Sequence, residues 1–263
     1  MNILLLGSTG MLGAYINAYF TKCTKHYLCS LDIRTGKVED YIKDFDLLIN
    51  CVGIIKPRVK VVGSVETIRI NSLLPWQLQE LCLANNKKMI HVSTDCVFSG
   101  DYSWLHDENT PASAKDLYGK SKYLGEIDQL TTIRTSIIGE ELKNKYSLVE
   151  WVKSSNNKTV NGFTNHYWSG LTCLELAKYI DKNIIEKDNF WQGMRHVYST
   201  ETNKFDLVKD IASAFNLNVT VEAKADKERC NRALNSIYPG QLVDKSIRNQ
   251  LIDLNQFSKT LQS

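Results

Sequence analysis

The chain has 263 residues, and its 32 Lys and Arg residues against 29 Asp and Glu residues leave a formal net charge of +3 at pH 7. Hydrophobic residues make up 43% of the chain, which excludes disordered, fibrous and low-complexity proteins, and the length allows one large domain or two unequal lobes. The basic residues are scattered instead of gathered in a stripe, so the sequence predicts no nucleic-acid partner.

The cysteine content favours a reduced protein. Seven cysteines form an odd set without a CxxC pair or the spacing of a metal-binding finger, and no cluster of His, Asp and Glu suggests a metal site. The first apolar run stops at Gly7, too early for a signal peptide. No run approaches the roughly 18 apolar residues that a membrane span needs. We therefore expect a cytoplasmic protein without a membrane partner.

Short apolar runs alternate with longer amphipathic stretches in the first half of the chain. Strands are predicted at 3–6, 27–31, 47–52, 89–93 and 132–135, and helices at 11–20, 38–43, 68–84 and 118–129. The runs at 3–6 and 46–52 lack polar alternation, as do strands that are buried on both faces of a sheet. This order predicts an α/β fold with a doubly wound parallel sheet.

The pattern becomes less regular after about residue 139. A polar turn is predicted at 154–158, helices at 173–186 and 205–215, a strand at 196–199, and a short polar tail at 253–263. We expect residues 1–139 to form the first lobe and residues 140–263 a smaller one, which can return one strand to the sheet.

A glycine-rich turn stands between the first predicted strand and the first predicted helix. Its sequence is Gly7-Ser8-Thr9-Gly10-Met11-Leu12-Gly13. Glycines there let the backbone turn tightly and approach a pyrophosphate, which the amides at the positive end of the helix then hold. This context predicts a dinucleotide cofactor bound by Gly7, Thr9, Gly10, Met11, Leu12 and Gly13.

The end of the second predicted strand bears on which dinucleotide binds. An acidic side chain at this point bonds the adenosine ribose hydroxyls, whereas a basic one pairs with a 2′-phosphate. Asp32 therefore favours NADH and Arg34 favours NADPH. Both residues are predicted to bind the cofactor, and the choice between NADH and NADPH stays open.

Two further features indicate a ligand site at the carboxyl end of the sheet. Tyr118 and Lys122 are spaced i and i+4, which places them on one face of a helix. The apolar run 89–92 ends in Ser93-Thr94-Asp95, and doubly wound sheets bind their ligands at the carboxyl ends of the strands. We interpret the two features together as one candidate site.

Together these motifs resemble those of the extended short-chain dehydrogenase/reductase superfamily, and within it the dTDP-4-dehydrorhamnose reductase-like sugar-nucleotide reductases. The motifs occur in the family's order across residues 1–139, and weaker similarity reaches about residue 240. The resemblance implies a Rossmann-type sheet with a smaller C-terminal substrate-binding lobe. It also implies hydride transfer from NADPH or NADH to the C4 keto group of a nucleotide-linked 4-keto-6-deoxy sugar. The segments that carry it are 7–13, 50–53, 93–100, 118–122 and 134–136.

The resemblance implies that Thr94, Tyr118 and Lys122 are catalytic. Hydride that arrives at a carbonyl carbon leaves an alkoxide that needs a proton. Tyr, with an ordinary pKa of about 10, supplies that proton well only where its phenolate is stabilised. Lys122 would lower the pKa of Tyr118, and Thr94 would hold the keto oxygen against Tyr118.

The resemblance also implies further contacts. The backbone of Cys51, Val52 and Gly53 would lie along the cofactor, and Arg232 would meet the substrate diphosphate through its planar fork. Asn231 and Ala233 stand where the family usually has Asp and Ser. The predicted substrate-binding residues are Ser93, Thr94, Asp95, Cys96, Trp168 and Arg232.

Two alternatives stay open. Cys96 stands where these reductases usually have Tyr, and a relative in the superfamily, GDP-fucose synthase, uses a Cys and a His for 3,5-epimerisation before reduction. A Cys96 thiol of lowered pKa, with His166 as partner, would abstract a proton next to the keto group. The other alternative is a non-catalytic regulatory subunit that keeps the cofactor site. We expect a monomer or a homodimer.

Overall fold

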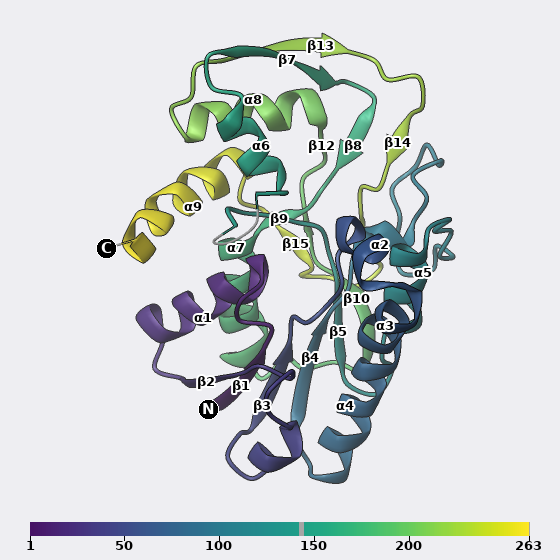
Figure 1. The fold of residues 1–263 in the computed structure, drawn as a ribbon, viewed down its shortest axis with the longest axis vertical. Coiled ribbons are helices and arrows are strands. Elements are labelled where there is room, and N and C mark those ends of the chain that lie inside the picture. Colours follow the sequence, from purple (N-terminus) through teal and green to yellow (C-terminus); the bar gives the residue numbers. More distant parts are fainter. Residues whose placement is uncertain (142–144, 263) are drawn as a thin grey trace.

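The computed structural model describes residues 1–141 and 145–262. Residues 142–144 and Ser263, which belong to the predicted smaller lobe, lie outside the described residues. Figure 1 shows a central sheet with helices on both faces, and a group of shorter strands and helices above it.

Within the described residues, six strands form the central sheet, and every pair of neighbours in it is parallel. The order is β10-β5-β4-β3-β1-β2, so the chain winds outward from β1 in both directions. The strands are β1 (Asn2–Leu6), β2 (Tyr27–Leu31), β3 (Leu47–Asn50), β4 (Lys88–Val92), β5 (Thr131–Arg134) and β10 (Gly193–His196).

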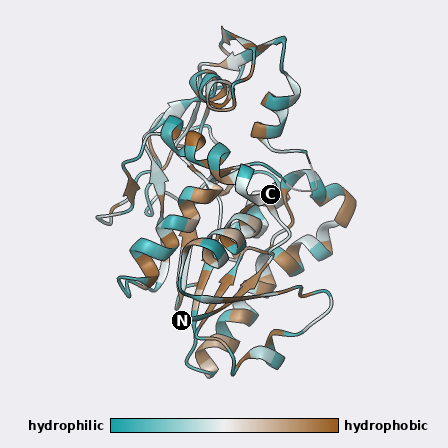
Figure 2. Cartoon of the chain, turned by 90° about the vertical axis from the view of Figure 1, so that its left-hand side faces the viewer, coloured by the Kyte–Doolittle hydropathy of each residue, from teal (hydrophilic) through white to brown (hydrophobic). Residues whose placement is uncertain are grey.

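The inner strands are apolar because both of their faces are covered. In β1, Ile3 and Leu5 pack with the helices of one face, whereas Leu4 and Leu6 pack with those of the other. All four side chains are at most 1% exposed. Figure 2 shows these hydrophobic strands inside the molecule, below helices of mixed hydropathy. Successive side chains of a strand point to opposite faces of the sheet, so β1 contributes to a hydrophobic core on each face.

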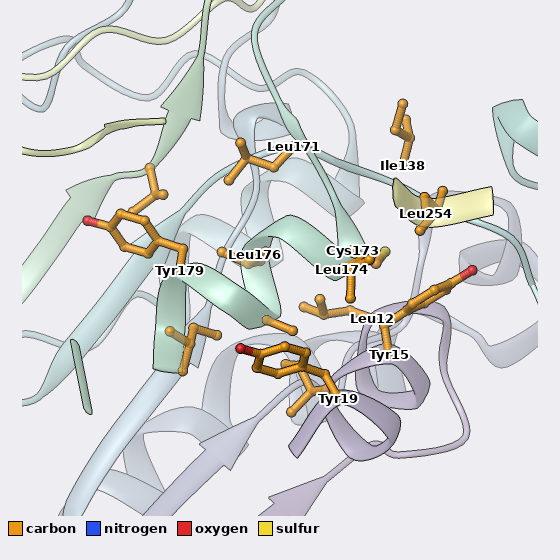
Figure 3. Close-up of a cluster of buried hydrophobic side chains, with 14 of the residues drawn as sticks. Leu12, Tyr15, Tyr19, Ile138, Leu171, Cys173, Leu174, Leu176, Tyr179 and Leu254 are labelled. Carbon is orange, nitrogen blue, oxygen red and sulfur yellow. The ribbon is translucent and has the colours of Figure 1, made fainter. Parts of the chain in front are cut away.

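Helices α1 (Met11–Cys23) and α7 (Cys173–Tyr179) cover one face of the sheet. Figure 3 shows Leu12, Tyr15 and Tyr19 of α1 facing the labelled residues of α7, with Leu254 in the same cluster. Leu254 belongs to α9 (Ile247–Gln262). The predicted polar tail at 253–263 is therefore wrong for its described part. The apolar residues of this helix are too widely spaced to form a run, but they share one face.

The opposite face is covered by α4 (Leu74–Ala84) and α5 (Leu117–Leu124). The predicted helix at 68–84 is divided into α3 (Ser64–Ile68), a π-helical turn (Arg69–Leu73) and α4. The predicted helix at 38–43 is a single 3-10 turn (Val38–Tyr41), and the one at 118–129 ends with α5. A further π-helical turn (Ile180–Ile185) follows α7.

Short paired strands and further helices form the rest of the described chain. They include the parallel pair β7–β13 and the three-stranded arrangement β12-β8-β14. The strands are β6 (Ile137–Ile138), β7 (Lys158–Phe163), β8 (His166–Trp168), β9 (Leu171–Thr172), β11 (Tyr198–Ser199), β12 (Thr202–Asn203), β13 (Val219–Lys224), β14 (Cys230–Asn231) and β15 (Leu242–Val243). The helices are α2 (Val59–Val62), α6 (Leu148–Ser154) and α8 (Lys204–Ala214), and 3-10 turns lie at Lys56–Arg58 and Asp95–Val97.

The predicted fold class, a doubly wound parallel sheet of the Rossmann type, is confirmed. Two parts of the second half of the chain belong to it in space, since β10 pairs with β5 and α7 packs against α1. The division at residue 139 stays a prediction. No helix in the described parts of the chain has both the length and the apolar character that crossing a bilayer requires.

Candidate active site

The glycine-rich turn joins β1 to α1 and leaves its backbone open. Gly7 has a φ of +84°, and a Cβ on Gly13 would lie 2.1 Å from the carbonyl oxygen of Gly7. Gly10 caps α1 without a side-chain bond, and the first turn of the helix has no acidic residue. Backbone amides at this helix terminus are thus available for an anion, which fits the pyrophosphate of a dinucleotide.

The side chains of this turn differ in what they can reach. Thr9 and Gly10 are exposed and Met11 is half-buried, so they lie where a ligand could touch them. Leu12 is 6% exposed and belongs to the core between α1 and α7. Leu12 could therefore meet a cofactor through its backbone, not through its side chain.

Asp32 and Arg34 follow β2 and bind each other. The Arg34 guanidinium donates from Nε to Asp32 Oδ1 at 2.9 Å and from Nη2 to Oδ2 at 2.6 Å. These hydrogen bonds lower the pKa of Asp32 to about 2. The acidic and the basic residue that the sequence singles out thus form one surface ion pair just after β2.

Cys51, Val52 and Gly53 lead from the glycine-rich turn toward Lys122. A Cβ on Gly7 would lie 2.9 Å from the carbonyl carbon of Cys51. At the other end, a Cβ on Gly53 would lie 4.0 Å from Lys122 Nζ. The segment therefore forms a continuous backbone strip between the anion-binding turn and the candidate catalytic helix, as a bound dinucleotide would need.

Tyr118 and Lys122 lie on α5, which Asp116 caps by accepting a hydrogen bond from the Gly119 amide at 2.8 Å. Lys122 is 5% exposed, and its Nζ donates to the Val92 carbonyl oxygen at 2.8 Å. Burial lowers the pKa of Lys122 to about 8, against the opposing effect of Glu126 and Cys51.

Thr94 faces Tyr118 from the end of β4. Burial raises the pKa of Tyr118, and the nearby Thr94 side chain opposes that rise. Thr94 Oγ1 also accepts from the Cys96 amide at 3.2 Å. The structure thus brings together the three predicted catalytic residues, Thr94, Tyr118 and Lys122, with the tyrosine in its protonated form.

A cavity of about 240 Å³ opens beside this group. Three of the predicted substrate residues line it, namely Asp95, Trp168 and Arg232, together with Lys204 and Cys230. Burial raises the pKa of Asp95, and the nearby charge of Arg232 opposes that effect. Lys204 carried no signal in the sequence, because its place at the start of α8 depends on how the helix packs.

Backbone oxygens orient Arg232. Its Nε donates to the Phe98 carbonyl at 2.9 Å and its Nη2 to the Ser99 carbonyl at 3.2 Å. Asn231 closes the same turn by accepting from the Ala233 amide at 2.9 Å. The Asn231 amide oxygen therefore accepts the hydrogen bond that an Asp carboxylate oxygen at this position would accept.

Cys96 and His166 do not form a pair. The Cys96 thiol lies 3.9 Å from Arg232 Nη1, and burial together with Asp95 raises the pKa of Cys96 to about 12. His166 Nε2 lies 3.1 Å from Asp226 Oδ2 and 3.2 Å from the Glu228 carbonyl oxygen. This arrangement does not supply the thiolate that proton abstraction by Cys96 requires.

Ser93 is drawn away from the cavity. Its Oγ donates to Glu126 Oε1 at 2.6 Å, and Ser93 is not among the residues that line the cavity. Glu126 was not predicted from the sequence, although it follows Lys122 by four residues. Among the described residues, no group of three or more His, Cys, Asp and Glu side chains has the geometry of a metal site.

Comparison with known proteins shows which family the chain belongs to. The model of the family described as "RmlD substrate binding domain" matches residues 1–263. The chain belongs to this family. The sequence is also 26% identical over 136 residues to dTDP-4-dehydrorhamnose reductase of Mycobacterium tuberculosis, in a match that covers 47% of this chain and 44% of that protein. The match thus spans less than half the length of this curated relative.

Solved structures of proteins named dTDP-4-dehydrorhamnose reductase share the fold of this chain. A dTDP-4-dehydrorhamnose reductase from Bacillus anthracis in complex with NADP is 20% identical, with a TM-score of 0.79 and coverage of 98% of this chain and 99% of that one. A dTDP-4-dehydrorhamnose reductase from Clostridium acetobutylicum is 17% identical, with a TM-score of 0.76 and full coverage of both chains.

Proposed function

We propose that this protein is an NAD(P)H-dependent reductase that acts on the C4 keto group of a nucleotide-linked 4-keto-6-deoxy sugar. The observation that carries the proposal is the meeting of Tyr118, Lys122 and Thr94 between a backbone strip suited to a dinucleotide and a cavity that contains Arg232. Family membership and the names of the relatives support the same substrate class.

The chain's own residues account for the proton transfer and for binding. A bound NADPH or NADH supplies the hydride. Tyr118 donates its proton to the keto oxygen as negative charge develops there, and Thr94 hydrogen bonds to the same oxygen. Lys122 stabilises the resulting phenolate. Arg232 and Lys204 hold the diphosphate of the substrate at the far side of the cavity.

The position of each residue follows from this assignment. The glycine-rich turn would hold the cofactor pyrophosphate, and the backbone of Cys51, Val52 and Gly53 would lie along the cofactor toward Lys122. Asp95, Cys96 and Trp168 would border the substrate. Because all seven cysteines are free thiols, we place the activity in the reducing cytoplasm. We keep a monomer or a homodimer as the expected state, to be measured by light scattering.

The decisive experiment measures oxidation of NADH and NADPH at 340 nm with dTDP-, UDP- and GDP-linked 4-keto-6-deoxy sugars. We expect turnover with one of them, and a loss of kcat of about 10²- to 10⁴-fold in Tyr118→Phe, which lacks the proton donor. Tyr123→Phe is the matched control, because Tyr123 lies on the same helix but is 47% exposed. Tight cofactor binding without turnover of any substrate would instead favour the regulatory subunit.

A further inference from the structure

Glu126 follows α5, and its carboxylate joins the elements that carry the candidate catalytic residues. Arg134, on β5, donates to it from Nε at 2.8 Å and from Nη2 at 2.5 Å. Ser93, just after β4, donates from Oγ at 2.6 Å. The Glu126 and Arg134 side chains are 7% and 2% exposed. One buried carboxylate thus ties the end of α5 to β4 and β5.

These bonds bear on the distances between catalytic groups. Tyr118 and Lys122 lie on α5, whereas Thr94 directly follows Ser93. Lys122 Nζ also donates to the carbonyl oxygen of the residue before Ser93. A movement of Glu126 would therefore shift the proton donor relative to Thr94, and misplacement of a catalytic group by about 1 Å can lower a rate by about 10²-fold.

The other side of the α5 terminus is already fixed by the backbone. A Cβ on Gly125 would lie 2.0 Å from the carbonyl oxygen of Asn71, in the π-helical turn before α4. Asn71 Nδ2 donates to Ser121 Oγ at 3.1 Å. One side of the end of α5 thus contacts the turn at Asn71, and Glu126 attaches the other side to the sheet.

Arg134 is held in turn by His196 on the neighbouring strand. Arg134 Nη1 donates to His196 Nε2 at 3.0 Å, and His196 Nδ1 donates to the Asn235 carbonyl oxygen at 2.7 Å. Burial, with the charge of Arg134, lowers the pKa of His196 to about 4, so the ring is neutral and can accept from Arg134. The chain of bonds ends three residues after Arg232.

The charges around Lys122 give Glu126 a second effect. The titratable groups that act on Lys122 from the elements around it are Glu126 after α5, Cys51 after β3 and His91 on β4. Burial raises the pKa of Cys51 to about 12 and lowers the pKa of His91, so both are neutral near pH 7. The Glu126 carboxylate, which is paired with Arg134, then supplies the negative charge near Lys122 and favours the charged form of Lys122.

We propose that Glu126 is a positioning residue of the reductase: it holds Tyr118 and Lys122 at their working distance from Thr94 and favours the charged form of Lys122. This inference rests on the proposed function, because it assigns Glu126 a part in the same proton transfer.

Ser93→Ala tests the positioning without disturbing the buried ion pair. We expect kcat to fall about tenfold, while KM for the sugar nucleotide and Kd for NADPH stay within about threefold. Ser258→Ala is the matched control, because it also removes one buried serine hydroxyl. The Ser258 hydroxyl lies 2.7 Å from the Tyr15 hydroxyl of α1, away from the candidate catalytic residues. A rise in KM with unchanged kcat would make Ser93 a substrate contact and overturn the proposal.

Glu126→Gln tests the charge. Without the carboxylate, Lys122 loses its proton at lower pH, so we expect the alkaline limb of the kcat profile to move down by about half a unit or more, and Glu126→Asp to restore part of the shift. A merely structural role would leave the limb in place, and that result would overturn the proposal. If Glu126→Gln leaves Arg134 uncompensated and does not fold, Ser93→Ala decides alone.

Wild-type turnover separates failure of this inference from failure of the proposed function. Should the wild type reduce none of the sugar nucleotides, the proposed function fails, and the pH dependence of NADPH affinity replaces kcat as the readout. A break near pH 8 that moves down in Glu126→Gln supports the role of Glu126, and an unmoved break overturns it.

Discussion

The pairing of Asp32 with Arg34 changes the cofactor preference that each residue indicates by itself. Each alone indicates a different cofactor, but in the structure Arg34 forms a two-point ion pair with the Asp32 carboxylate. The carboxylate that would repel a 2′-phosphate is thus partly neutralised, and the guanidinium is held next to the expected ribose position. We infer that Arg34 permits NADPH to bind without preventing NADH from binding.

Replacement of Arg34 by Ala should therefore separate the two cofactors. We expect the Kd for NADPH to rise about tenfold or more, because a charge-assisted bond to the phosphate is lost, and the Kd for NADH to change less than about threefold. Titration of cofactor fluorescence measures both constants. Arg69→Ala, which removes another exposed arginine paired with an acid, is the control. Equal weakening of both cofactors would contradict the assignment.

The burial of Lys122 opposes the stability of the folded protein. The ordinary pKa of Lys is 10.5, and that of Lys122 is about 8 because the side chain is buried. Between these values the unfolded chain holds a proton that the folded chain lacks, so the free energy of unfolding rises with pH from about 8 to about 10.5. Below pH 8, the buried charge costs the folded state about 3 kcal/mol.

Lys122→Met should consequently stabilise the cofactor-free protein while it abolishes reduction. We expect a gain of about 1–3 kcal/mol in the free energy of unfolding at pH 7, which disappears near pH 10.5. Urea unfolding at both pH values measures the gain. Lys120→Met, at an exposed position of the same helix, should change stability little at either pH. Destabilisation by Lys122→Met at pH 7 would refute the argument.

At the scale of elements, α9 forms where the sequence predicts a polar tail. Its charged and polar residues outnumber its apolar ones, but Leu251 and Leu254 are fully buried in the core of α1 and α7. A helix that presents one narrow apolar stripe has low mean hydropathy over its whole length. The helix therefore packs its apolar stripe into the core that α1 and α7 form on one face of the sheet.

Leu254→Ala tests this contribution of α9. We expect a loss of about 2–4 kcal/mol in the free energy of unfolding, because the cavity left behind is surrounded by packed side chains. Ile252→Ala, on the same helix but 37% exposed, should lose less than about 1 kcal/mol. Urea unfolding of both variants gives the comparison, and equal losses would show that α9 does not pack as described.

At the scale of the whole molecule, the candidate site is assembled from both halves of the chain. The backbone strip and the candidate catalytic residues come from residues 7–122, whereas Trp168, Lys204 and Arg232 border the cavity from the second half. Because the two ligand positions use different residues, binding of a nucleotide diphosphate and binding of NADPH should be separable by substitution.

Arg232→Met should remove the stabilisation by nucleoside diphosphates and keep the stabilisation by NADPH. At 100 times its Kd, a ligand stabilises the folded protein by about 2.7 kcal/mol, which a thermal melt detects as a rise in Tm. We expect the variant to lose most of the Tm rise with dTDP, UDP or GDP and to keep the rise with NADPH. Arg248→Met, at an exposed position of α9, should keep both rises. An unchanged nucleotide response in Arg232→Met would place the diphosphate elsewhere.

The sequence by itself determined the features that depend on neighbours along the chain. Continuous aliphatic runs predicted β1 and β3, because a strand buried on both faces has no polar positions. The glycine-rich turn predicted the open helix terminus, and the i, i+4 spacing placed Tyr118 and Lys122 on one face of α5. These features are local, so residue type and spacing contain the needed information.

The tertiary structure decided what depends on contacts between distant segments. Four such features are the π-helical turn at Asn71, the position of α9, the pairing of Asp32 with Arg34 and the protonated state of Cys96. The Glu126–Arg134 pair is another, since neither residue indicates its burial in the sequence. Burial and charge set pKa values and orientations, and both arise from segments that meet only after folding.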